Sequence, residues 1–532
     1  MFEPDRRLAE AARLHEARRL GEAETILRAL LAEADACGRS RPPPVLARLA
    51  GVLLDRGDPE RAYTIADEAA ALAPADPLAH NLRAMALATL GRLAEADRAL
   101  STALELDPSR AELHHNRGRI LAGAGRHEAA IASFRRALEI EPTLAAARAA
   151  VVPLLRHAGR FGEALELLDA MDAAERERPG MLAERGLLLY QLRRPAEALA
   201  VLDRAIAADP AAEAPRMHRA HALLLMGDYA RGWPAHDFLY HRPSRRPPPF
   251  DRPRWTGQDV AGRTVVVWND LGFGDAIQFV RYVPRLAARG ATVVLLVQRP
   301  LVRLLASVAG AARVAAIGEP IGAHDFHVEL MALPTAFRAR LDDVAAPLPY
   351  LAPDRAIRER WAARFPTGSR PRVGLVWAGE PRPHLPLAHA ADRRRSIPLA
   401  ALAPLAAVEG VDLVSLQLGE ARAERAAVPF AARIDDPMDG VADFADTAAI
   451  VERLDLVVSV CTAAAHLVGA LGRPGLVLLC FDACWRWLHQ REDSPWHPTL
   501  RLLRQPAPGE WAAPVARAAS AVADLASARA RA

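Results

Sequence analysis

The glycine-rich segment Leu271-Gly-Phe-Gly-Asp275 joins an apolar run to an amphipathic one. Gly272 and Gly274 carry no side chain, so the backbone there can approach a ligand closely. The first N–H groups of the helix that follows have no partner within that helix and suit an anion. Asp275 then presents a carboxylate of the kind that acts as a general base. The alternative is that Asp275 only caps the helix.

A second segment, Ser459-Val-Cys-Thr-Ala-Ala-Ala-His466, also follows an apolar run and opens a helix. Thr462 and the N–H groups after it, beginning at Ala463, form a natural cradle for a phosphate group. His466 lies one turn into the predicted helix. A single histidine in that position is more often a packing or capping residue than a catalyst.

The third candidate is Asp392-Arg-Arg-Arg-Ser-Ile-Pro398, which follows a predicted strand that ends in Trp377-Ala-Gly379. An arginine in this run can neutralise a diphosphate leaving group through paired hydrogen bonds. The alternative is an ordinary run of solvated surface arginines.

Strands and helices in alternation must position these segments. Continuous apolar runs predict strands at 264–268, 292–297, 372–377, 412–416, 454–460 and 476–479, and an amphipathic helix is predicted over 276–289. Apolar strands separated by helices indicate parallel sheets that are covered on both faces. We therefore predict two doubly wound α/β lobes, at 263–365 and 371–520, with ligands bound between them at the carboxyl ends of the strands.

The chain before these lobes repeats itself every 34 residues. Four positions keep this period, and their members are Gly57, Gly91, Gly125, Gly159 and Gly227 (with Arg193 at the vacant step); Ala62, Ala96, Ala130, Ala164, Ala198 and Gly232; Ala50, Ala84, Gly118, Val152, Gly186 and Ala220; and Pro74, Pro108, Pro142 and Pro210. This pattern is typical of tetratricopeptide repeats.

Each repeat is predicted to be a pair of antiparallel helices. Glycine permits the tight turn within the pair, small residues let the helices approach, and proline is expected in the first turn of the next hairpin. Stacked hairpins form a superhelix with a groove that binds a protein or peptide. Gly21 indicates one further, degenerate repeat, so the array is predicted over 1–235. A purely architectural role is the alternative.

The proline-rich segment 241–250 cannot continue a helix, and we predict a linker over 236–262. The formal charge is +4, but the chain contains no lysine and its charges alternate in sign, so we expect no nucleic-acid partner. Four scattered cysteines fit a reducing cytoplasm. We expect no signal peptide and no membrane span.

Several segments resemble bacterial glycosyltransferases of GT-B fold, related to the heptosyltransferases of glycosyltransferase family 9. The resemblance covers about 263–515 and is carried by residues 272–282, 373–379, 395–399, 414–417 and 443–449. The most specific string is Trp-Arg-Trp-Leu-His-Gln-Arg-Glu-Asp-Ser-Pro-Trp-His-Pro (485–498). It is similar to the ending of a subgroup in which this domain follows tetratricopeptide repeats.

The resemblance implies metal-independent transfer of a sugar from a nucleotide-sugar donor, with no other cofactor. It implies that Asp275 is the base for the acceptor hydroxyl and that Arg395, with Ser396, faces the donor diphosphate. Thr462 and Ala463 match the phosphate cradle, and Gln417 and Trp377 lie on loops that would face the donor. Cys461 stands where the family usually has aspartate, which puts that contact in doubt. No partner base for a Cys461 nucleophile is identifiable nearby in the sequence.

The sequence therefore favours a cytoplasmic protein glycosyltransferase whose array recruits a polypeptide acceptor. Flagellin is one acceptor that fits this arrangement. The rival hypotheses are transfer to a lipid or polysaccharide, and a non-catalytic protein-binding scaffold with degenerate transferase lobes. Cys461 favours the scaffold, whereas the Gly274-Asp275 and Arg395-Ser396 pairs favour the enzyme.

Overall fold

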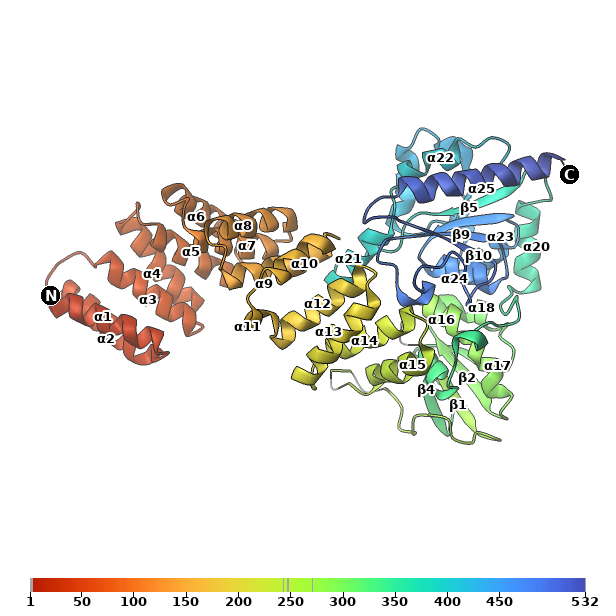
Figure 1. The fold of residues 1–532 in the computed structure, drawn as a ribbon, viewed down its shortest axis with the longest axis horizontal. Helices are drawn as coiled ribbons and strands as arrows, with labels where there is room; N and C mark the ends of the chain where they lie inside the picture. Colours follow the sequence, from red (N-terminus) through yellow and green to blue (C-terminus); the bar gives the residue numbers. More distant parts are fainter. Residues whose placement is uncertain (1–2, 243, 246–247, 270, 532) are drawn as a thin grey trace. The chain divides into compact units, whose positions relative to one another are not determined.

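The structure, a computed structural model, describes residues 3–242, 244–245, 248–269 and 271–531 (Figure 1). Asp270, which precedes the glycine-rich segment, and Pro243, Arg246 and Pro247 of the predicted linker lie outside the described residues. The chain forms two compact units. The first runs to Ala158 and includes Glu166–Met171, and the second comprises Gly159–Leu165 and the chain from Asp172 onward.

Helical hairpins make up most of the chain before the first strand (Figure 1). Their helices are α1 (Glu3–Glu16), α2 (Leu20–Ala36), α3 (Pro43–Asp55), α4 (Pro59–Leu72), α5 (Pro77–Thr89), α6 (Leu93–Leu106), α7 (Ala111–Gly123), α8 (His127–Ile140), α9 (Ala145–His157), α10 (Phe161–Asp169), α11 (Ala173–Arg176), α12 (Pro179–Gln191), α13 (Pro195–Ala208), α14 (Glu213–Leu225) and α15 (Tyr229–Asp237). Successive helices pack as pairs, for example α5 on α6 and α12 on α13.

The predicted glycine turns are confirmed. Gly57, Gly91, Gly125, Gly159 and Gly227 all have φ between +72° and +80°. This left-handed conformation costs glycine little but strains other residues. At the vacant step of the series, Arg193 adopts the same conformation, with φ +61°. The turn geometry is therefore kept even where the glycine is missing.

The small residues lie where the paired helices meet, as predicted. Ala62, Ala96, Ala130, Ala164 and Ala198 are fully buried. A Cβ atom at Gly118 would come within 2.7 Å of the Phe134 ring, and one at Gly186 within 2.5 Å of Leu202. Helices at this separation leave no room for a side chain at those two positions.

One detail of the predicted repeat is wrong. Pro74 and Pro108 precede the next helix and lie in the connecting turn, where their carbonyl oxygens bond to His80 and His114 at 2.9 Å. They therefore do not occupy the first helical turn. The further repeat predicted around Gly21 is present as the hairpin of α1 and α2. Gly21 lies inside α2, and the turn of this hairpin is made at Arg18, which has φ +59°.

The chain after the helices contains two parallel sheets with helices around them. The first has the strand order β3-β2-β1-β4, with β1 (Thr264–Trp268), β2 (Thr292–Val297), β3 (Ala311–Ala316) and β4 (Phe326–Glu329). The prediction of β1 and β2 is confirmed. The sequence did not predict β3, which is rich in alanine and partly exposed, or β4, which has four residues.

The second sheet has the strand order β10-β9-β8-β5-β6-β7 and is also parallel. Its strands are β5 (Arg372–Val376), β6 (Asp412–Ser415), β7 (Ile434–Asp435), β8 (Leu456–Val460), β9 (Gly475–Leu479) and β10 (Leu500–Arg504). Four of them agree with the prediction to within two residues at each end. The edge strands β7 and β10 were not predicted.

The helices of this part are α16 (Phe273–Phe279), α17 (Val283–Ala287), α18 (Val302–Leu305), α19 (Leu333–Ala336), α20 (Arg355–Arg364), α21 (Pro386–Arg395), α22 (Ala403–Ala406), α23 (Phe444–Val451), α24 (Ala463–Ala470) and α25 (Ala512–Arg531). The helix predicted over 276–289 begins earlier, at Phe273, because Asp275 accepts a hydrogen bond from the Gly272 N–H. It is then interrupted before Pro284, which has no N–H to continue the helical ladder.

The second unit has a core that extends beyond the sheets. One cluster of buried side chains joins Tyr229 and Trp233 of α15 to Phe279 of α16, Leu467 of α24 and Trp485. A separate cluster covers the other face of the second sheet. The last helical hairpin is therefore packed into the same core as the sheets. Among the described residues, no helix combines the length and the apolar character that crossing a bilayer would need.

Candidate functional site

Two of the predicted loops meet where α16 packs on α24. Helix α16 follows β1, and α24 follows β8 with Thr462 as its N-cap residue. A Cβ atom at Gly274 would lie 3.0 Å from the His466 ring and 3.4 Å from Ala463 Cα. Gly274 therefore lets the two helix starts approach closely, and its missing side chain serves helix packing.

The carboxylate of Asp275 has two partners. Its Oδ2 atom accepts a hydrogen bond from the Gly272 N–H at 3.1 Å, and its Oδ1 atom accepts one from Arg486 Nη2. About a fifth of the Asp275 side chain stays exposed. The candidate base is thus both a helix-capping residue and one half of an ion pair. The string 485–498 is distinctive in the sequence, but nothing within it indicates that Arg486 pairs with Asp275.

Arg486 is held on several sides. Its guanidinium lies over the Trp485 ring at 4.4 Å, and it contacts Met331 Sδ at 3.4 Å and Cys484 Sγ at 3.9 Å. Burial acts to lower the pKa of Arg486, but the charges of Asp275 and Cys484 outweigh it and raise this pKa above its ordinary value. Arg486 therefore stays cationic and connects Asp275 with Cys484.

Cys461 and Cys484 are hydrogen-bonded to each other, and Trp487 Nε1 donates to Cys461 Sγ at 2.9 Å. The hydrogen bond to Cys484 and burial raise the pKa of Cys461 well above its usual range. The same hydrogen bond and the nearby Arg486 lower the pKa of Cys484 to about 6. The sequence could not show this pair, because no spacing rule connects cysteines 23 residues apart across a strand.

Arg395 belongs to the same neighbourhood. Two of its nitrogens donate to Asp392 Oδ1, at 2.6 and 2.9 Å. Burial acts to lower the pKa of Arg395, but its interactions with Cys461 and Asp392 raise it overall. We refer to Asp275, Arg395, Cys461, Cys484 and Arg486 as the central cluster. Three of its five members were predicted site residues.

Three other predicted residues are used within the fold. Ser396 Oγ accepts from the Gly379 N–H at 3.0 Å. Gln417 Oε1 accepts from the N–H groups of Trp377 and Ala378 at 3.0 and 2.9 Å, and its amide nitrogen donates to two carbonyls. Gln417 and Trp377 are both buried. These contacts fix the loop after β5, while donor binding by these side chains stays a prediction.

His466 is a packed residue, the alternative that the sequence favoured. Its Nδ1 atom lies 3.2 Å from His497 Nε2, and its ring stacks on Trp487 at 5.0 Å. Burial and the charge of Arg486 lower the pKa of His466 to about 3, so the ring is neutral at physiological pH. Thr462 lies beside it at the helix start, with Oγ1 3.4 Å from Ser459 Oγ.

Hydrogen bonds also connect the string 485–498 to other parts of the second unit. Arg281 donates to the Trp496 carbonyl at 2.7 Å, to the Val344 carbonyl at 2.9 Å and to the Tyr350 hydroxyl at 2.9 Å. On the array side, Trp496 Nε1 donates to the Tyr229 hydroxyl at 2.7 Å. The string therefore contacts the last hairpin through Trp496 and supplies Arg486 to the central cluster.

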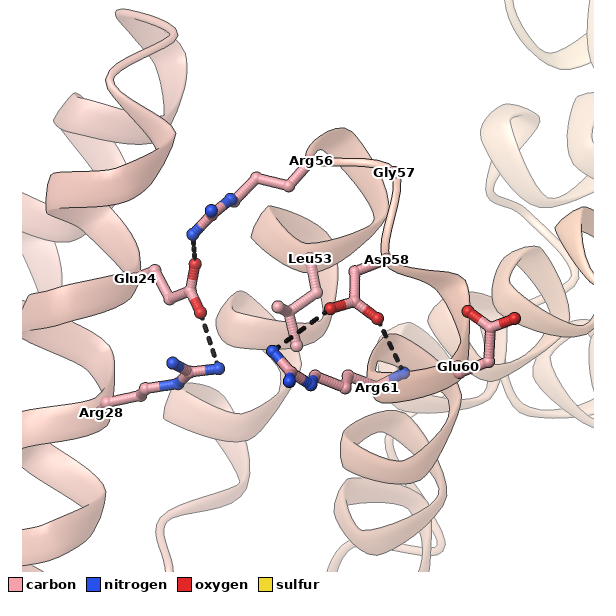
Figure 2. Close-up of a pocket in the computed structure, with 8 residues that line it drawn as sticks. All are labelled: Glu24, Arg28, Leu53, Arg56, Gly57, Asp58, Glu60 and Arg61. Atoms are coloured by element: carbon pink, nitrogen blue, oxygen red, sulfur yellow. Dashed lines mark hydrogen bonds and ion pairs between the residues drawn. The ribbon is translucent and has the colours of Figure 1, made fainter.

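Cavities occur elsewhere in the molecule. One cavity of about 410 Å³ lies in the first unit, between α2 and the turn that joins α3 to α4. Figure 2 shows the charged side chains that line it. Glu24 is buried there and pairs with Arg28, at 2.7 Å, and with Arg56. Another cavity of about 410 Å³ lies beside α17 and is lined by Arg281, Tyr350 and the segment 343–347. Neither includes a residue of the central cluster.

Comparison with known families identifies the helical region. Two family models, each described as tetratricopeptide repeat, match this chain: one at residues 47–97, 83–149 and 183–231, the other at 121–183. The prediction of tetratricopeptide repeats is confirmed. Repeats of this kind imply a protein or peptide partner.

Protein FlbA of Caulobacter vibrioides (strain ATCC 19089 / CIP 103742 / CB 15) is 28% identical over 334 residues, which cover 58% of this chain and 54% of FlbA. The chain thus spans about half the length of this relative. Because 58% of the chain exceeds the helical part before β1, the match includes some of the region with the sheets.

Solved structures are similar to shorter stretches. The crystal structure of YrrB, described as a TPR protein with an unusual peptide-binding site, is 22% identical, with a TM-score of 0.29 over 31% of this chain and 86% of YrrB. The APC/C hetero-tetramer Cut9-Hcn1 gives 17% identity and a TM-score of 0.36 over 41% of this chain and 43% of that chain.

Proposed function

We propose that the protein is a glycosyltransferase of GT-B fold that moves a sugar from a nucleotide-sugar donor to a protein acceptor. The observation that carries this proposal is the central cluster. It joins a candidate base, Asp275, to a candidate diphosphate partner, Arg395, beside the start of α24. These residues follow the carboxyl ends of β1, β5 and β8, the edge at which parallel sheets bind ligands.

In the proposed reaction, Asp275 accepts the proton of the acceptor hydroxyl. Arg486 holds the Asp275 carboxylate in place and acts as a positioning residue. Negative charge that develops on the departing diphosphate is stabilised by Arg395 and by the N–H groups at Thr462 and Ala463. In this proposal, Arg395 and the backbone N–H groups take the place of a metal ion in stabilising the diphosphate charge.

The acceptor in this proposal is a Ser or Thr side chain of a polypeptide bound by the repeats. Support comes from the way α15 shares its core with the sheets, so that the last hairpin and the central cluster belong to one packed unit. Flagellin is the acceptor we would test first. A lipid or polysaccharide acceptor is the alternative for the same chemistry.

The test uses the full-length protein, a panel of nucleotide sugars and a cell extract, with intact-protein mass as the readout. We expect a mass increment on one protein that requires a single donor. Asp275→Asn and Arg395→Met should each reduce the rate at least about a hundredfold, because each removes a group that acts in the transition state. The matched controls, Glu409→Gln and Arg393→Met, change exposed residues and should retain full rate.

A second candidate function is a non-catalytic protein-binding scaffold. Two observations favour it: Asp275 is already paired with Arg486, and cysteine replaces aspartate at position 461. Calorimetry distinguishes the two functions. If none of the nucleotide sugars binds while the full-length protein still captures a partner, the scaffold is correct and the enzyme proposal is wrong.

A further inference from the structure

The contact between Cys461 and Cys484 joins two segments of different origin. Cys461 follows β8, and Cys484 precedes the short helix η10 (Trp485–Trp487). Each side chain is half-buried, and neither cysteine is in a disulfide. The Cys461 thiol donates its hydrogen bond to Cys484, while Cys461 Sγ itself accepts one from Trp487 Nε1 at 2.9 Å. Fixed neighbours on both sides therefore hold the two sulfur atoms in place.

The charges around the pair favour a thiolate on Cys484. Arg486 Nη1 lies 3.9 Å from Cys484 Sγ, and Arg395 interacts with Cys461. With its pKa lowered to about 6, Cys484 is mostly deprotonated at pH 7. The other titratable groups that interact with the pair are Tyr190, Cys480 and Arg504.

We propose that Cys461 and Cys484 are a reactive dithiol that a peroxide oxidises reversibly to a disulfide. In the first step the Cys484 thiolate attacks one peroxide oxygen, the O–O bond breaks, and hydroxide leaves, which gives a sulfenic acid. In the second step Cys461 loses its proton and attacks Cys484 Sγ, the S–O bond breaks, and water leaves. The two sulfurs lose two electrons and the peroxide gains them. A dithiol reductant reverses the reaction by exchange.

The two other cysteines provide internal comparisons. Cys37 is exposed on the first unit. Cys480 is buried, and burial together with the charge of Asp482 raises its pKa well above the usual range. The geometry thus predicts a clear order of reactivity at pH 6, with Cys484 first, Cys37 next and Cys480 last. This chemistry does not depend on sugar transfer.

The experiment treats the full-length protein with iodoacetamide or with hydrogen peroxide and maps the products by mass spectrometry. Cleavage before aspartate places Cys484 on peptide 482–492, and Cys461 with Cys480 on peptide 455–481. At pH 6 we expect Cys484 to alkylate about tenfold faster than Cys37. Peroxide should link the two peptides, and dithiothreitol should release them.

Variants identify which sulfurs take part. Cys480→Ser should keep the link, and Cys461→Ser should leave a sulfenic acid on Cys484 that dimedone traps. Three results would overturn the proposal: no link in the wild-type protein, a link that Cys480→Ser abolishes, or alkylation of Cys37 ahead of Cys484. The wild-type map needs no variant to fold, so the proposal can fail on that measurement alone.

Discussion

The hairpins α5–α8 and the last hairpin, α14–α15, use one repeat in two ways. In α5–α8 the buried contacts recur, with a small residue such as Ala96 or Ala130 at each helix crossing. In α15 the small residue is kept as Gly232, but the neighbouring side chains Tyr229 and Trp233 are buried against Trp485 and Trp496. The small residues at each helix crossing hold the two helices of a hairpin together. The aromatic contacts of Tyr229 and Trp233 occur once, and they pack the last hairpin into the core of the second unit.

A repeated sequence pattern can specify the contacts that recur in every hairpin, but not the contacts that occur only once. A periodic contact is specified at every step, so one missing glycine, at Arg193, does not change the turn. A contact that occurs once has no such redundancy. The second unit depends on several of these, including the ion pair of Arg486 with Asp275 and the bonds of Arg281, and it should be the more fragile region.

The largest expected effect is that of acid. Burial lowers the pKa of His236 and His466 to about 3, from an ordinary value of 6.5. The unfolded chain therefore binds more protons below pH 6.5, and stability is lost as the pH falls from 6.5 towards 3. Each histidine should remove about 1.4 kcal/mol per pH unit from the free energy of unfolding.

Tryptophan fluorescence measures this loss in the second unit alone, because all nine tryptophans lie there. The urea midpoint should fall steeply between pH 6.5 and 5. His236→Gln should flatten that slope by about 1.4 kcal/mol per pH unit, while the exposed His127→Gln should leave it unchanged. An unfolding midpoint that is constant from pH 7 to 5 would show that these histidines do not titrate as argued.

Next in size is Trp233→Ala, which removes the side chain that joins α15 to Trp485. The cost should be about 3–5 kcal/mol, typical of a large aromatic residue deleted from a core. Hydrogen exchange should become faster in 485–498. Phe134→Ala in α8 is the matched deletion within the array and should act on α7 and α8 only. Unchanged exchange in 485–498 after Trp233→Ala would contradict the aromatic connection.

A smaller effect is expected within one helix. Gly118→Ala should destabilise the hairpin α7–α8 by about 1–3 kcal/mol, because the added methyl group meets the Phe134 ring. Gly123→Ala, at the end of the same helix, meets only Leu93 at 3.7 Å and should stabilise it by about 0.5 kcal/mol. Regional hydrogen exchange compares the two variants, and equal effects would refute the close-approach argument.

The smallest effect concerns the vacant step of the glycine series. Arg193→Gly should be about 1 kcal/mol more stable than Arg193→Ala, since alanine keeps the left-handed strain that glycine relieves. Both variants lose the contact of Arg193 with the Phe481 ring, at 5.1 Å. The difference between their free energies of unfolding therefore reports the backbone strain alone. Chemical denaturation monitored by tryptophan fluorescence can measure this difference in the free energy of unfolding. A difference near zero would show that the backbone at position 193 is not strained.

The sequence was sufficient for features that local patterns determine. The turn glycines, the buried alanines and the apolar strands β1, β2, β5 and β9 all follow from residue type and period. It failed for β3, whose alanines and arginine carry little strand signal. Pro74 and Pro108 were assigned to a helix start, although a proline is equally compatible with the turn that precedes it.

The candidate site was predictable only in part. Asp275, Arg395 and Cys461 could be named because each lies in a recognisable local segment. Their partners could not, since Arg486 is 211 residues from Asp275 and Cys484 is separated from Cys461 by a helix and a strand. Trp377 and Gln417 looked like ligand-facing residues, yet their hydrogen bonds are within the fold.

The boundary between the two compact units crosses the hairpin α9–α10 and not the proline-rich segment 241–250. This has an evolutionary consequence. Duplication or loss of a 34-residue copy between α3 and α8 would leave the aromatic neighbours of α15 untouched. Recombination at 241–250 would instead part Trp233 from Trp485 and expose both. Copy number should therefore vary among relatives upstream of α9, while α14 and α15 are inherited together with the sheets.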